Sequence, residues 1–187
     1  MWFKRIIAVL TTVLFMNVAV AQENKENKLE NTLYIDLPHG RVVIEMLPDV
    51  APKHVQRIKE LAREKFYDGI VFHRVIEGFM AQTGDPTGTG TGSSDKPDLE
   101  AEFSNIPHER GSVSMARATN PNSANSQFFI VFEDSNFLDG QYTVWGKVSS
   151  GMEHVDSIKK GDARNNGQVD GPTAMVSVRV AADVEKN

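Results

Sequence analysis

The chain has 187 residues, a formal net charge of −5 at pH 7 and no cysteine. This length is enough for one domain with a complete hydrophobic core, and an apolar fraction of 40% is ordinary for a globular protein. The negative charge gives no indication of a nucleic-acid partner. The lack of cysteine excludes disulfide bonds and thiol chemistry, so any activity must depend on other side chains.

The first 21 residues have the pattern of a secretory signal peptide. Lys4 and Arg5 form a short basic head, and residues 6–20 are mostly apolar. Small residues at positions 19 and 21 supply a cleavage pattern. An uncleaved membrane anchor is the alternative, but the apolar run is short for a membrane span. We therefore expect cleavage after Ala21, a periplasmic location, and no stable membrane association of the cleaved protein.

Residues 22–31 differ in composition from the segments on either side. They are charged and rich in amides, with one leucine. Such a segment has too little apolar surface to offset the entropy lost on ordering, so we expect a flexible N-terminal tether outside the core. Residues 32–187 are expected to form one domain. We expect a monomer, because no apolar helix face or strand edge in the sequence calls for a partner.

Hydrophobic periodicity predicts the elements of this domain in chain order. Alternation predicts strands at 32–37 and 41–47, two short strands within 72–85, and strands at 111–116, 127–132, 142–148 and 174–182. Helical spacing predicts an amphipathic helix at 52–65 and a shorter helix at 151–159. The glycine-rich stretch 84–97 is expected to be a long loop.

The eight predicted strands are short, are joined by turns and do not alternate with helices. This order is typical of an antiparallel sheet and not of βαβ units. Eight strands are enough to close a barrel filled with side chains. We therefore expect a mainly β fold, a closed eight-stranded antiparallel β-barrel capped by two α-helices.

Within residues 72–85, a single cation stands among large apolar side chains. Alternation would place Phe72, Arg74 and Ile76 on one face of a strand. Burying a guanidinium there without a partner would cost on the order of several kcal/mol. Arg74 could bind a polar group of an otherwise apolar ligand, or it could belong to an ordinary core and reach solvent or a carboxylate. The residues alone leave both interpretations open.

Metal-dependent and nucleophilic chemistries have little support in the sequence. The five histidines lie far apart, with no His-x-x-His pair and no cysteine, so we expect neither a metal site nor a cofactor. The serines lie outside any nucleophile-elbow pattern.

Six motifs follow one another along the chain. They are FHRVI (72–76), GFMAQTGD (78–85), GTG (88–90), VSMAR (113–117), NSQFFI (125–130), and LDG (138–140) followed by WGKV (145–148). In this order they resemble the motifs of the cyclophilins, a family of peptidyl-prolyl cis-trans isomerases. The resemblance extends over residues 32–183. It implies an eight-stranded barrel with a helix at each end, which agrees with the predicted elements, and a site on the outside of the barrel.

Matched position by position, the resemblance implies that Arg74 is the catalytic residue. The proline ring of the substrate would lie in a pocket formed by Phe79, Met80, Phe129 and Leu138. The substrate backbone would contact Gln82, Gln127, Ala116 and the main chain of Arg117. His73 is expected at the rim of the site or behind it, and not as an acid or base.

Two further substrate-binding positions depart from many eukaryotic relatives. Phe137 stands where those relatives have Trp, and Tyr142 stands where they have His. The Trp indole donates a hydrogen bond to cyclosporin in those relatives, and Phe137 has no donor. We therefore expect weak or no cyclosporin binding.

The implied reaction needs neither a nucleophile nor a metal, because no bond is broken. Rotation about an X-Pro peptide bond is slow, since it disrupts a partial double bond at a barrier of about 18–20 kcal/mol. A donor such as Arg74, aimed at the twisted amide, would stabilise the transition state. We expect a prolyl isomerase acting on proline-containing peptides and unfolded exported polypeptides. A cyclophilin-like peptide-binding chaperone module with little catalysis is the alternative, because it would use the same groove.

Overall fold

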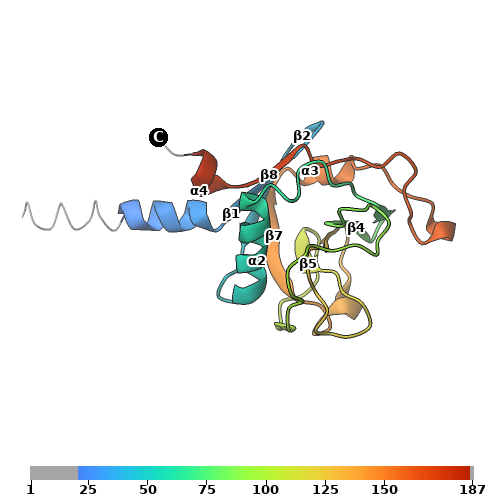
Figure 1. Cartoon of the computed structure of the whole chain (residues 1–187), viewed down its shortest axis with the longest axis horizontal. Helices are drawn as coiled ribbons and strands as arrows, with labels where there is room; N and C mark the ends of the chain where they lie inside the picture. Colours follow the sequence, from blue (N-terminus) through green and yellow to red (C-terminus); the bar gives the residue numbers. More distant parts are fainter. Residues whose placement is uncertain (1–20, 186–187) are drawn as a thin grey trace, which may run out of the picture.

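The structure is a computed structural model that describes residues 21–185. Its fold is mainly β, with eight antiparallel strands in one curled sheet of order β3-β4-β6-β5-β7-β2-β1-β8 (Figure 1). The strands are β1 (Thr32–Leu37), β2 (Gly40–Met46), β3 (Arg74–Ile76), β4 (Met80–Thr83), β5 (Ser112–Met115), β6 (Phe128–Val131), β7 (Val144–Ser150) and β8 (Ser177–Val180). The predicted antiparallel architecture is therefore confirmed.

Five short helical elements accompany the strands after residue 31. They are α2 (Pro52–Arg63), α3 (Met152–Asp156), α4 (Ala181–Val184) and the 3-10 helices η1 (Asn136–Leu138) and η2 (Ala163–Asn165). Helix α2 packs against β7 and β8, whereas α3 packs against β2. These two correspond to the two predicted helices, and both are shorter than predicted. No helix in residues 21–185 combines the length and the apolar character that crossing a bilayer requires.

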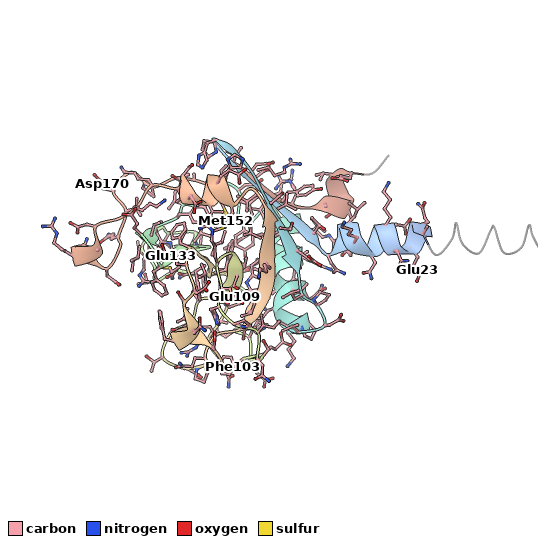
Figure 2. The ribbon with its side chains drawn as sticks, turned by 180° about the vertical axis from the view of Figure 1, so that it is seen from behind. Glu23, Phe103, Glu109, Glu133, Met152 and Asp170 are labelled. Carbon is pink, nitrogen blue, oxygen red and sulfur yellow. The ribbon has the colours of Figure 1, made fainter. Side chains whose placement is uncertain are left out.

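The prediction of a closed barrel is corrected to a curled sheet, because no ladder joins edge strands β3 and β8. An irregular excursion, residues 157–176, lies between them instead and extends from the body of the fold, where Asp170 marks it in Figure 2. It bonds to the chain around β3 through Phe72 N to Thr173 O (2.9 Å) and Val75 N to Gly167 O (2.8 Å). Pro172 has no N–H to donate, so a regular strand cannot run through this segment.

The main core is formed by the inward side chains of the strands and the buried face of α2. Strand β1 shows the expected alternation, with Leu33 and Ile35 fully buried. Phe128 of β6 packs edge-on against Trp145 and Tyr67, with ring centroids 5.5 and 5.6 Å apart. This packing fixes β6 from the inside and thereby positions the side chains on its other face.

Strands β4 and β6 are buried on both faces. Ala81 and Phe128 point into the main core, whereas Met80 and Phe129 belong to a second apolar cluster on the opposite face. Phe72 also lies in the main core, so the prediction that it shares a face with Arg74 is wrong. The reason is that β3 begins only at Arg74, and strand alternation does not extend back to Phe72.

Residues 21–30 are helical (Figures 1 and 2). The sequence predicts a flexible tether at residues 22–31 instead. Side chains 21–28 are exposed, but Glu30 pairs with Arg63 of α2 at 2.8 Å, and Asn31 accepts from Lys59 Nζ at 2.8 Å. The segment has no glycine or proline and is rich in helix-forming residues, which explains the helix. Residues 1–20 lie outside the described residues, so the signal peptide stays a prediction.

Candidate active site

A small cavity of about 130 Å³ opens on the face of the sheet that carries the second apolar cluster. It is lined by Arg74, Phe79, Met80, Gln82, Ala116, Arg117, Phe129, Leu138 and Tyr142. All nine are predicted from the sequence to be site residues. They come from β3, the turn before β4, β4, β6, η1 and the segments that follow β5 and η1, so the fold brings together positions between 74 and 142, more than a third of the chain.

The floor of the cavity is apolar and packed from behind. Met80, Phe129 and Leu138 are buried. The ring of Phe129 lies edge-on to Tyr142, with centroids 5.7 Å apart, and stacks on His108 at 6.3 Å. His108 is held in turn by Asp139, whose carboxylate lies 2.9 Å from its Nδ1. The floor is therefore a rigid surface that suits an aliphatic ring.

Arg74 forms the polar side of the cavity, and its partners are neutral. Its Nη1 donates to Gln82 Oε1 at 3.1 Å, its Nε donates to the main-chain oxygen of Asn166 at 3.0 Å, and its Nη2 donates to Asn166 Oδ1 at 3.1 Å. Burial lowers the pKa of Arg74, but a guanidinium stays protonated at neutral pH. Because amides bind it, the positive charge beside the apolar floor is not cancelled. Asn166 is a site residue that the sequence does not predict.

A second set of hydrogen bonds fixes Gln82. Its Nε2 donates to Gln127 Oε1 at 2.9 Å, and Gln127 Nε2 donates to the main-chain oxygens of Gly92 (2.8 Å) and Gly90 (3.1 Å). Gln127 therefore does not line the small cavity. It orients Gln82 and lines a neighbouring pocket of about 460 Å³.

The loop that supplies these glycine oxygens is organised by Asp85, which is buried. Its carboxylate accepts from the N–H groups of Thr87 (2.7 Å), Gly90 (2.6 Å) and Gly92 (3.1 Å). Burial raises the pKa of Asp85, but these hydrogen bonds outweigh it and lower the pKa to about 2. A Cβ at Gly92 would lie 2.1 Å from the carboxylate, so the loop needs glycine there for close approach to Asp85.

Arg117 contributes its side chain as well as its main chain. The guanidinium lies 4.6 Å above the Tyr142 ring, and its Nε and Nη2 donate to the main-chain oxygen of Gln141 at 3.2 and 3.0 Å. Arg117 and Ala116 line both the small cavity and the larger pocket. They therefore form the boundary between these two pockets.

Phe137 and His73 lie outside the small cavity. Phe137 is 66% exposed, and its ring centroid is 5.4 Å from that of Phe79, so it stands at the outer edge. His73 is buried next to Arg74 and faces a separate pocket of about 350 Å³. Burial lowers the pKa of His73, which favours the neutral ring at pH 7.

Comparison with known proteins identifies one family over most of the chain. Residues 32–180 match the family described as cyclophilin type peptidyl-prolyl cis-trans isomerase. A probable peptidyl-prolyl cis-trans isomerase of Brucella suis is 50% identical over 181 residues, which cover 91% of this chain and 92% of the relative. Peptidyl-prolyl cis-trans isomerase B of Bacillus subtilis is 43% identical over 142 residues, covering 75% of this chain and 99% of the relative.

Solved structures give the same family. A cyclophilin from Hirschia baltica superposes with a TM-score of 0.75 at 28% identity, covering 83% of this chain and 75% of the other. A cyclophilin-type isomerase from Cryptosporidium parvum, crystallised in the presence of the dipeptide Ala-Pro, superposes with a TM-score of 0.73 at 27% identity. That match covers 80% of this chain and 98% of the other.

Asp85→Asn tests how much the buried carboxylate stabilises the fold. At pH 7 we expect the free energy of unfolding to fall by about 1–2 kcal/mol, because an amide oxygen accepts the loop N–H groups more weakly than a carboxylate. The folded-state pKa of about 2 lies below the unfolded value of about 3.9. The stabilisation is therefore complete above the unfolded pKa and is lost as the pH falls toward 2. Urea unfolding at a series of pH values measures this.

Asp95→Asn is the matched control for this prediction. Asp95 is an exposed acid on the same loop. Its variant should follow the wild-type protein at every pH. A difference between wild type and Asp85→Asn that stays constant down to pH 2 would contradict the role given to the carboxylate.

Proposed function

Because this chain belongs to the cyclophilin-type peptidyl-prolyl cis-trans isomerases, and so accelerates rotation about X-Pro peptide bonds, we propose that the cavity beside Arg74 holds the proline ring during the reaction. The observation that carries this proposal is a charged guanidinium at the edge of an apolar floor, whose oxygen acceptors among the described residues all belong to amides. The alternative of a module with little catalysis has no support from the family.

The chemistry follows from what rotation does to the amide. In the twisted state the nitrogen regains its lone pair, so a donor near that nitrogen stabilises the transition state more than either planar isomer. Three of the hydrogen bonds of Arg74 are made to Gln82 and Asn166. Its Nη1 also lies 3.7 Å from the sulfur of Met80, a weak acceptor in the cavity floor. A substrate group can replace that sulfur as acceptor without disturbing the other bonds.

The apolar floor has two roles in this proposal. Met80, Phe129 and Leu138 hold the ring while the acyl side of the bond turns. They also keep water away from one side of the guanidinium, and the field of a charge is stronger where water is excluded. A fixed ring and a fixed donor therefore act together on one bond.

Arg74→Ala tests the assignment of the catalytic residue. Loss of one well-placed donor costs about 100–1,000-fold in enzymes that depend on it, so we expect kcat/KM to fall on that scale. Exchange NMR or a protease-coupled assay with an Ala-Pro peptide measures the rate, and circular dichroism checks folding. Arg74→Lys keeps the charge but not the planar fork, and should have intermediate activity. A folded Arg74→Ala variant with wild-type kcat/KM would place the reaction elsewhere.

For substrates, we propose proline-containing segments of unfolded exported polypeptides. The relative from Cryptosporidium parvum was crystallised with Ala-Pro, which supports recognition of a short proline peptide. The N-terminal leader pattern supports export to the periplasm.

The location can be tested in a Gram-negative host that expresses the full chain. We expect the protein in the periplasmic fraction with Gln22 as its first residue, as shown by N-terminal sequencing. Ala19→Gln replaces a small residue of the cleavage pattern and should leave the leader attached. Recovery of an uncleaved wild-type chain in the cytoplasm would overturn this part of the proposal.

We further propose that cyclosporin binds weakly, because Phe137 offers no hydrogen-bond donor at the outer edge of the site. Phe137→Trp should tighten binding by about fivefold, the effect of one net hydrogen bond of about 1 kcal/mol. Isothermal titration calorimetry measures both proteins. Phe103→Trp adds an indole at another exposed position and should change nothing. Submicromolar affinity of the wild-type protein would contradict the proposal.

A further inference from the structure

We propose that Asn166 is a positioning residue for the isomerase, which holds the guanidinium of Arg74 at a fixed angle without cancelling its charge. The proposal rests on the assignment of Arg74 as the catalytic residue. Asn166 directly follows η2 within the irregular excursion. It is 92 positions from Arg74 in the sequence. It belongs to none of the motifs that resemble the cyclophilins.

The geometry is that of a two-point clamp. The Nε of Arg74 donates to the main-chain oxygen of Asn166 at 3.0 Å, and Nη2 donates to Asn166 Oδ1 at 3.1 Å. Two parallel bonds from one edge of a guanidinium fix its plane, as a carboxylate does in a bidentate ion pair. The two acceptors of Asn166 give the same fixation with no negative charge.

Gln82 alone would not fix the guanidinium. It binds only Nη1, at 3.1 Å, which leaves the plane free to turn about that contact. An arginine side chain has about 2 kcal/mol of rotamer entropy to lose when it is ordered. With Asn166 on the opposite edge, that ordering is complete before the substrate arrives. A preorganised donor acts on the transition state, so its loss should lower kcat more than it changes KM.

The backbone at this position explains why an asparagine stands here. Asn166 has φ 52° and ψ 29°, a left-handed conformation that asparagine adopts more readily than most residues. The turn is bonded directly to β3, since Val75 N donates to Gly167 O at 2.8 Å and Gly161 N donates to Val75 O at 2.9 Å. The turn that carries Asn166 is therefore bonded to Val75, the neighbour of Arg74 in β3. Asn166 and Arg74 keep their relative position for this reason.

Asn166→Gly removes the side-chain acceptor and keeps the left-handed backbone and its oxygen. We expect kcat for an Ala-Pro peptide to fall about three- to tenfold, the effect of one hydrogen bond to an exposed charged group, with KM within about twofold of wild type. Asn165→Gly is the control, because its side chain donates to Gln168 and makes no bond to Arg74 among the described residues. It should leave both constants unchanged. Wild-type kcat in Asn166→Gly would overturn the proposal.

Asn166→Asp separates positioning from charge. An aspartate can accept the same two bonds, but it neutralises the guanidinium, so kcat should fall at pH 7 although the clamp is kept. Pairing with Arg74 lowers the pKa of that aspartate below its ordinary value of about 3.9, so part of the rate should return as the pH falls toward 2. The nearby His73 and Asp162 titrate in the wild type and in Asn166→Gly too, and those proteins should lack this recovery. Exchange NMR between pH 2 and 7 measures it, and a profile parallel to wild type over that whole range would count against the proposal.

A double variant tests whether Asn166 acts through Arg74. Lysine at position 74 has no Nε–H and no planar fork, so Asn166→Gly should cost nothing more in the Arg74→Lys background. An equal loss in both backgrounds would show that the turn acts in another way and would overturn the proposal. Full activity of Arg74→Ala would instead overturn the assignment of the catalytic residue, so the two failures are distinguishable.

Discussion

The site depends on one constraint, which is that a permanent positive charge is held at the edge of an apolar surface by neutral partners. Arg74 is fixed by Gln82 and Asn166, and all three acceptor oxygens belong to amide groups. A carboxylate in either place would hold the side chain as firmly but would cancel the charge that we propose acts on the twisting amide. Gln82 is fixed in turn by Gln127, so the amide bonding extends to the glycine-rich loop.

The sheet makes this arrangement rigid, because β4 and β6 serve the core and the site at once. Ala81 and Phe128 fill the main core, while Met80 and Phe129 form the cavity floor on the opposite face. Interiors packed at the density of crystals resist small displacements, so the floor cannot shift unless the core repacks. In the proposed function, rotation about one amide bond requires a fixed pocket for the proline ring opposite a fixed donor.

Those parts of the site that lie within short motifs could be predicted from the sequence, and those that depend on long-range contacts could not. Phe79, Met80 and Gln82 are close together in the chain, so one motif carries their relation. Asn166 lies on an exposed turn without periodicity, and only the fold brings it to Arg74. Strand alternation failed at Phe72 because a pattern does not show where β3 begins. The number of strands was predictable, whereas closure of the ladder depends on an excursion interrupted by Pro172.

That excursion has a consequence for the two outer edges of the sheet. An exposed strand edge is a template on which another polypeptide can add a strand and aggregate. Here the outer edge of β3 is occupied by the excursion, through Val75 N to Gly167 O, and on β8 the N–H of Val178 donates to the Asp68 carboxylate at 3.1 Å. Contacts within the chain therefore occupy the outer edge of β3 and the N–H of Val178 in β8. An extended polypeptide that contacts this protein therefore meets no free edge on β3 or at Val178 with which to pair.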